Sequence, residues 1–218
     1  MKWMTAILVS SILVSLTALG GETPDVVAIM VQKAPKIDGK LTDEAWLDVA
    51  KNHRGVMSGW RRFGGDGGLV PQQRIAYVCY DAQALYIGMQ AFTPDIYKLK
   101  SDANGNPFIG DCLEVHLKIP EGEYYQFGTD ILGQLAIGKA PKGVTLDGIV
   151  TASDFGDNCW IAEISIPWST LKLVPKPGLR LGFTLAANNA YQGNGVWSAV
   201  YWGNAYSAQS GNTVLELR

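Results

Sequence analysis

The chain has 218 residues, of which 47% are hydrophobic and 17% are charged, and its formal net charge is −2 at pH 7. This balance is typical of a globular protein with a sizeable core and excludes a disordered chain. A weakly acidic protein has no electrostatic attraction for phosphate backbones or anionic membranes, so nucleic-acid binding is not expected.

The first twenty residues differ from the rest of the chain. Lys2 is the only charged residue before Glu22, and residues 4–19 are apolar or small. Ala18 and Gly20 are the small residues that a signal peptidase requires. The pattern predicts a signal peptide at 1–20 and a secreted or periplasmic mature protein that does not contact the membrane after cleavage; an uncleaved anchor is the alternative.

No linker, composition break or repeat divides residues 21–218, which predicts a single domain. Its three cysteines are Cys79, Cys112 and Cys159. An odd number permits at most one internal disulfide, and the spacings match no zinc motif. Two interpretations stay open: one disulfide with one free thiol, or three thiols buried as small apolar residues.

One helix is predicted, over residues 42–50. Thr42 is its candidate N-cap, and Trp46, Val49 and Ala50 recur at the spacing that places them on one buried face. After residue 55 the pattern predicts strand after strand. The expected strands are 74–80, 85–92, 112–119, 124–130, 133–138, 145–153, 159–166, 180–189, 195–201 and 213–217.

The strand at 112–119 shows the clearest alternation. Leu113, Val115 and Leu117 share one face, and Glu114 and His116 lie on the other, which predicts a strand with its polar face at the surface. Many short strands with regular turns and a single helix predict an all-β fold, specifically a jelly-roll-like, two-sheet antiparallel β-sandwich.

Five short motifs occur in order along the chain. They are IDG with DEAW at 37–46, AYVCYD with LYI at 76–87, GDCLEV at 110–115, WIAEISIPW at 160–168 and LGFT at 181–184. Together they resemble the family 9 carbohydrate-binding modules, which are often appended to xylanases and other secreted enzymes that degrade polysaccharides. The resemblance extends from about residue 26 to the end and implies a β-sandwich of two antiparallel sheets.

In the sugar-binding members of that family, two aromatic residues clamp a sugar. The first, on the loop before the Gly-Asp-x-x-Glu strand, corresponds to Phe108; the family's binders have Trp there, so the stacking surface is smaller. For the second, Tyr206 is the nearest candidate, because Trp202 aligns better with a structural Trp.

Aromatic rings beside Asn, Gln and Asp side chains suit a sugar, because rings pack on its C–H faces and the polar groups bond its hydroxyls. Trp46, Trp160 and Trp168 are expected in the core, and core packing is the alternative for every aromatic residue. The residues expected to bind carbohydrate are Phe108, Asn104, Asn106, Asp111, Asn189, Gln192, Trp202 and Tyr206.

Structural calcium is a candidate cofactor of this chain. Asp102 and Asn104 place oxygen atoms at alternate positions, although the rest of the EF-hand pattern is missing. The family's members often bind structural calcium, which implies a site from this loop or from Asp81 and Asp95. The alternative is that these residues form turns.

No catalytic constellation is recognised. The sequence has no Gly-x-Ser-x-Gly, His-Glu-x-x-His or phosphate-binding motif, and Glu114 and Glu163 occupy motif positions of a non-catalytic family. We therefore expect a monomeric binding domain rather than an enzyme. Its expected ligand is a cellulose- or xylan-type polysaccharide, and its expected partners are glycoside hydrolases on other chains.

Two alternatives come from other functional classes. Related sandwich domains bind haem in periplasmic redox proteins, and Met57, Met89, His53 and His116 are the candidate ligands, although the chain has no Cys-x-x-Cys-His motif. Against haem, His116 is expected at a strand surface and His53 in a loop. The other alternative is a protein-interaction or cell-surface module without sugar affinity.

Overall fold

The computed structural model describes residues 25–62, 68–189, 199–202 and 213–218, and for 199–202 only the backbone. None of the described helices has the length and apolarity that a bilayer crossing requires. The elements are β1 Val26–Met30, α1 Glu44–Asn52, β2 Val56–Met57, β3 Arg61–Arg62, β4 Arg74–Tyr80, β5 Ala84–Phe92, η1 Ile96–Lys98, η2 Pro107–Ile109, β6 Cys112–Lys118, β7 Tyr124–Asp130, β8 Leu135–Lys139, β9 Val150–Gly156, β10 Cys159–Pro167, β11 Arg180–Asn188, β12 Ala199–Trp202 and β13 Val214–Leu217.

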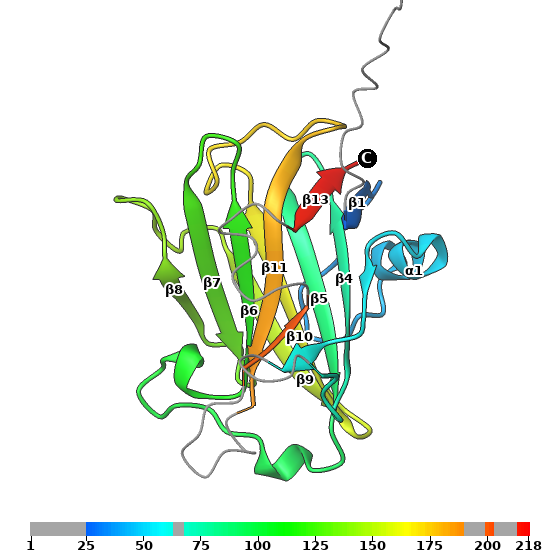
Figure 1. Ribbon diagram of the computed structural model, residues 1–218, viewed down its shortest axis with the longest axis vertical. Helices are drawn as coiled ribbons and strands as arrows, with labels where there is room; N and C mark the ends of the chain where they lie inside the picture. Colours follow the sequence, from blue (N-terminus) through cyan, green and yellow to red (C-terminus); the bar gives the residue numbers. More distant parts are fainter. Residues whose placement is uncertain (1–24, 63–67, 190–198, 203–212) are drawn as a thin grey trace, which may run out of the picture.

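The strands form two layers that pack face to face (Figure 1). The first sheet has the order β8-β7-β6-β11-β13, with β12 also paired to β11 and β3 paired to β12. The second sheet has the order β4-β5-β10-β9, with β2 beside β4. Neighbouring strands within each sheet run antiparallel, as the strand pattern predicts.

Strand β1 departs from the predicted topology because it joins the two sheets. Its first half, Val26–Ala28, pairs in parallel with β13, and Ile29 and Met30 pair in parallel with β4. The layers therefore form one continuous, mixed strand order, and the prediction of two separate antiparallel sheets is wrong at this point. The chain passes through α1 between β1 and β4, and a long crossover containing a helix is the connection that parallel neighbours need.

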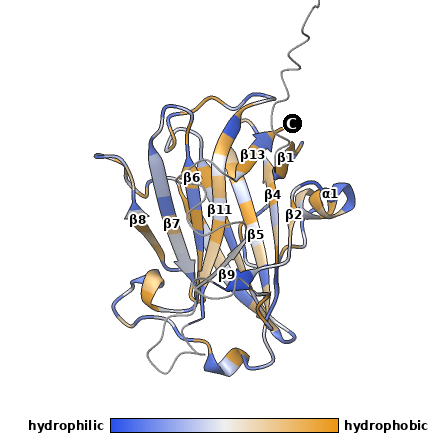
Figure 2. Ribbon diagram, viewed as in Figure 1, coloured by the Kyte–Doolittle hydropathy of each residue, from blue (hydrophilic) through white to orange (hydrophobic). Residues whose placement is uncertain are grey.

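The main hydrophobic core fills the space between the sheets, and hydrophobic and hydrophilic residues alternate along the strands that enclose it (Figure 2). Trp160 and Trp168 lie in this core with 1% and 2% of their surface exposed, as predicted. A second, smaller cluster lies beneath α1 and contains Trp46, which is 2% exposed. The helix is thus held to the outward face of the second sheet.

Helix α1 begins two residues later than predicted. Its N-cap is Asp43, with extended backbone angles of φ −71° and ψ 153°, so the prediction of Thr42 as N-cap is wrong. It ends at Asn52, and the C-cap residue His53 has a left-handed φ of 59°. Trp46 and Val49 are buried as expected, whereas Ala50 at the edge of the same face is half-buried.

The carboxylate of Glu163 on β10 fastens the segment before α1 to the second sheet. One oxygen, Oε2, accepts the backbone N–H groups of Asp38 at 2.8 Å and Gly39 at 2.5 Å. The other, Oε1, accepts the indole Nε1–H of Trp46 at 2.8 Å and the N–H of Leu41 at 3.4 Å. Glu163 has no exposed surface, so all four donors satisfy one buried carboxylate.

The strand predicted at 145–153 begins later, at Val150, because two glycines turn the chain before it. Gly143 and Gly148 have φ values of 85° and 78°, which other residues rarely adopt. Strand β8 also starts two residues after its predicted beginning, and β12 covers only the end of the predicted strand 195–201.

All three cysteines are buried, and none forms a disulfide. This confirms the interpretation of three buried thiols and contradicts a bridge. Burial raises the pKa of the Cys79 and Cys112 thiols well above the ordinary value, so both stay protonated at neutral pH.

Candidate functional site

Phe108 is carried by η2, in a loop that its own polar side chains hold in place. The Asn106 side-chain oxygen accepts the Phe108 N–H at 3.1 Å and caps the turn. Asp102 Oδ2 accepts the N–H groups of Asn104 and Asn106, each at 3.2 Å. The Phe108 carbonyl accepts the side-chain amide of Asn188 on β11 at 2.7 Å, which ties the loop to the first sheet.

The Phe108 ring lies on the outward face of the first sheet, where two strands carry glycine. A Cβ added at Gly128 on β7 would come within 2.5 Å of the ring Cε1. A Cβ at Gly138 on β8 would come within 2.9 Å of the ring Cζ. The ring therefore occupies space that any other residue at these positions would fill, and because Phe108 is half-buried, part of the ring stays accessible.

Glu114 on β6 lies beside this ring on the same outward face. It pairs with Gly128 on one side and Ala186 on the other, so only small residues flank it. Its Oε2 accepts the side-chain amide of Gln126 at 2.7 Å and lies 3.2 Å from His116 Nε2. Because 12% of the Glu114 side chain is exposed, the carboxylate is partly accessible.

His116, predicted at a strand surface, is only 1% exposed, so that prediction is wrong. Its ring lies between two partners: Nε2 faces Glu114, and Nδ1 bonds the hydroxyl of Tyr124. The Lys139 ammonium lies 5.4 Å from the centre of the Tyr124 ring. The polar face of β6 is therefore a bonded network that fixes the Glu114 carboxylate.

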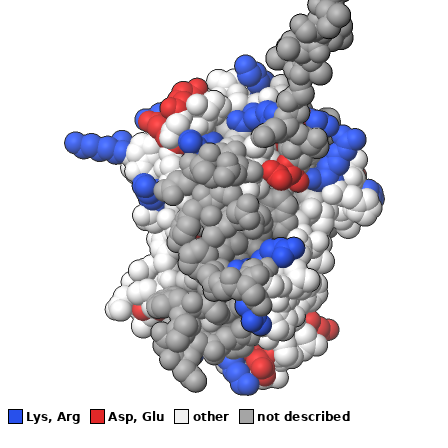
Figure 3. All heavy atoms as spheres, viewed as in Figure 1, with Lys and Arg blue, Asp and Glu red and all other residues white. Residues whose placement is uncertain are grey.

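The side chains of Phe108, Glu114 and Gln126 form a small surface, the platform, that carries both apolar and polar groups. The Phe108 ring offers an apolar surface, Glu114 offers accepting oxygens, and Gln126 offers both donor and acceptor atoms. Gln126 and the Phe108 ring both approach Gly138, with Gln126 Cδ at 2.8 Å from its added Cβ. In the view of Figure 3, Lys and Arg and Asp and Glu are interspersed on the described surface. The platform is suited to a neutral ligand with a flat apolar face and several hydroxyl groups.

Sequence reasoning singled out Phe108 but missed Glu114 and Gln126, which lie beside it on the platform. The signal for Glu114 was present, since the strict alternation at 112–119 places it opposite the core. Gln126 could be found only through its register, which pairs it with His116 on β6.

The other predicted carbohydrate-binding residues are scattered. Asn104 and Asn106 are exposed on the Phe108 loop, where Asn106 acts as a cap. Asp111 is 1% exposed, and its Oδ2 accepts the N–H of Lys100 at 2.8 Å, so it holds the loop together rather than facing outward. Asn189 is 3% exposed and bonds the buried Arg74 guanidinium.

The remaining predicted residues lie outside the described part of the chain. Gln192 and Tyr206 fall in the ranges 190–198 and 203–212. Trp202 ends β12, where its backbone pairs with Leu185 on β11, and its side chain is likewise not described.

The calcium candidates are not brought together. Asp81 lies at the turn before β5 and Asp95 after its other end, about 26 Å apart for a strand of this length, so a joint site is wrong. Asp81 bonds the N–H groups of Gln83 and Ala84 and the hydroxyl of Tyr86. No group of three or more acidic, His or Cys side chains gathers among the described residues. Calcium at Asp102 and Asn104 stays a prediction.

The haem candidates also lie apart. Met57 and Met89 are buried in the main core, at 1% and 0% exposure, while His53 is exposed at the end of α1. His116 faces outward on the first sheet, so the structure does not support this ligand set. Glu114 and Glu163 lie on the outward faces of different sheets, so the two carboxylates cannot flank one glycosidic bond.

The two packed layers of strands define a mostly β domain, and comparison with known proteins identifies its family. The profile of the family described as "Carbohydrate family 9 binding domain-like" matches residues 37–214. The chain belongs to this family of non-catalytic carbohydrate-binding domains. Comparison with curated protein sequences gives no match.

Two similar solved structures are of a family 9 carbohydrate-binding module from Caldicellulosiruptor kristjanssonii. The complex with glucose has a TM-score of 0.65 and 16% sequence identity, covering 88% of this chain and 95% of that one. The complex with cellotriose has a TM-score of 0.63 and the same identity, covering 88% and 93%. At this identity the similarity establishes a shared fold.

Proposed function

We propose that this domain binds cellulose- or xylan-type saccharides on the outward face of the first sheet. A pyranose ring packs against Phe108, and its hydroxyl groups bond Glu114 and Gln126. The observation that carries the proposal is the position of the Phe108 ring, which lies against Gly128 and Gly138 and beside the Gln126–Glu114 hydrogen bond of 2.7 Å. The glucose and cellotriose complexes of the similar structures support the choice of ligand.

The proposed role is to hold a polysaccharide without cutting it. The N-terminal segment 1–20 would direct the protein out of the cytoplasm, where it would act beside glycoside hydrolases carried on other chains. By binding the polysaccharide, the domain raises the local concentration of substrate near such an enzyme. Phe108 in place of Trp gives a smaller stacking area, so the affinity expected is lower than that of a Trp-bearing site.

The test is isothermal titration of the purified protein with cellobiose, cellotriose, xylobiose and soluble xylan. Phe108→Ala should weaken binding by about 1–3 kcal/mol, or roughly 5- to 150-fold, because it removes the stacking ring. The matched control is Phe155→Ala on β9, which removes a ring that is 44% exposed on the other sheet, and it should leave the affinity unchanged. No heat with any of these saccharides, from a protein shown to be folded, would contradict the proposal and favour an interaction module.

A further inference from the structure

A hollow lies on the side of the molecule opposite the platform, between α1 and the outward face of the second sheet. Its volume is about 180 Å³, enough for roughly six water molecules and comparable to one pyranose ring. Helix α1 lies at one flank of the domain beside β4 (Figure 1). The hollow is lined by residues of α1, of the segment before it and of strands β4, β5 and β10. The residues that matter are Leu41, Trp46, Ala50, Tyr77, Gln90 and Ile161.

The floor and walls of this hollow are apolar and partly aromatic. Trp46 is buried, and because its Nε1–H is donated to Glu163, it offers the hollow only its ring. Tyr77 on β4 and Ile161 on β10 are half-buried, so each has surface left for a ligand. A flat C–H face of a sugar fits such a surface, as it fits the ring of Phe108.

Polar groups stand at the edge of the same hollow. Gln90 on β5 donates to Cys159 Sγ at 3.3 Å, a weak acceptor, and no described residue bonds its side-chain oxygen. The Tyr77 hydroxyl likewise has no hydrogen-bond partner among the described residues. Burial raises the pKa of Tyr77, so the hydroxyl remains a donor at neutral pH.

Lys40 adds an exposed ammonium at the rim. The nearby carboxylate of Asp38 is taken by Lys36, at 2.8 Å, and Lys40 forms no ion pair within the described residues. An amide, a phenol and an ammonium provide both donors and acceptors within reach of one small ligand, which matches the hydroxyl groups of a sugar.

We propose that this hollow, the α1 pocket, is a second saccharide site that takes a single pyranose ring. The ring packs on Tyr77 and Ile161, and its hydroxyl groups bond Gln90 and the Tyr77 hydroxyl. The class of ligand rests on the proposed function, whereas the location rests on the cavity itself. Since Phe108 and Gln90 lie on the outward faces of different sheets, both sites can be filled at once, and one domain can hold two glycan chains.

The test uses the Phe108→Ala variant, which disables the first site, in a ¹H–¹⁵N NMR titration with glucose and cellobiose. The reporters are the side-chain amide of Gln90 and the indole N–H of Trp46, both at the α1 pocket. Both signals should shift with sugar in this variant as in the unaltered protein. Adding Gln90→Leu should weaken the interaction at least tenfold, and adding Ala50→Phe, which fills the pocket, should abolish it.

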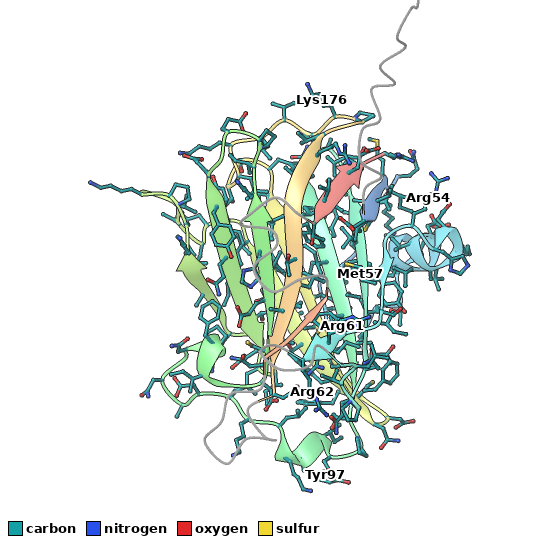
Figure 4. All side chains as sticks on the ribbon, viewed as in Figure 1. Arg54, Met57, Arg61, Arg62, Tyr97 and Lys176 are labelled. Atoms are coloured by element: carbon teal, nitrogen blue, oxygen red, sulfur yellow. The ribbon has the colours of Figure 1, made fainter. Side chains whose placement is uncertain are left out.

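The control is Tyr97→Ala, which removes a ring that is 83% exposed at one end of the molecule (Figure 4) and lines neither site. Tyr97→Ala should leave both titrations unchanged. If this variant lost saccharide binding, the contact would be non-specific and the proposal would be overturned. The proposal would also be overturned if the Gln90 and Trp46 signals of Phe108→Ala did not shift on adding sugar. Unaltered sugar binding after Gln90→Leu is added would overturn it as well. If those signals shift but the Phe108 loop never responds, the α1 pocket stands and the first site fails.

Discussion

The buried carboxylate of Glu163 gives the most direct test of how the segment before α1 is held. In Glu163→Gln the side chain keeps its size but has a single accepting atom and an NH₂ group. If the amide oxygen accepts the N–H groups of Asp38 and Gly39, the NH₂ group faces the N–H of Leu41 and the indole N–H of Trp46, which then have no acceptor. In the reverse orientation the N–H groups of Asp38 and Gly39 have no acceptor. One buried donor and one partly buried donor therefore lose their acceptor.

Each such donor costs about 1–3 kcal/mol, so the free energy of unfolding should fall by about 2–6 kcal/mol. For a domain of this size the midpoint of thermal unfolding should drop by roughly 4–24 °C. Urea denaturation followed by tryptophan fluorescence measures the change. Glu44→Gln, at an exposed position of α1, is the matched control and should shift the free energy by less than about 0.5 kcal/mol. An equally small change in Glu163→Gln would refute the reasoning.

Three further outcomes are expected. Gly138→Ala should displace the Phe108 ring, because the added Cβ would overlap it, and should weaken saccharide binding in titration while the protein stays folded. Unchanged affinity would show that the position of the ring does not affect binding. Cys79 and Cys112 should resist a thiol reagent until the protein is unfolded by urea, and rapid labelling of the native protein would contradict their burial. Burial, with a hydrogen bond to Glu123, raises the pKa of Tyr125 to about 12. Stability should therefore fall as the pH rises from about 10 toward 12, because the unfolded chain loses its proton first; Tyr125→Phe should lessen that slope in thermal melts, and an unchanged slope would contradict it.

Much of the fold follows from local patterns. The alternation on β6, the hairpin of β4 and β5 and the buried face of α1 were all predictable, because each depends on the spacing of apolar residues within one element. The double pairing of β1 was not predictable, because it depends on which distant strands lie beside it. The delayed start of β9 was missed because the strand pattern outweighed the turn signal of Gly143 and Gly148.

The platform was predictable in part. Phe108 came from the family resemblance, and its environment confirms that the ring lies on the outward face. Asp111 and Asn189 carry side chains suited to sugar, yet Asp111 already accepts the backbone N–H of Lys100 and Asn189 already bonds the buried guanidinium of Arg74. A polar residue type shows what a side chain is able to bond, and only its neighbours decide whether that capacity is already used.

The parallel pairing of β1 and β13 has a mechanical consequence. Val26 lies opposite Leu215 and Ala28 opposite Leu217. Because the pairing is parallel, the N-terminal end of β1 and the C-terminal end of β13 lie at opposite ends of the paired strands. Traction applied through the chain before β1 and after β13 pulls the strands past each other and loads their hydrogen bonds together, in shear. Since β1 is also bonded to β4, it cannot be drawn out without breaking its contacts with both sheets. A domain attached to an insoluble polymer would therefore withstand tension between its two ends.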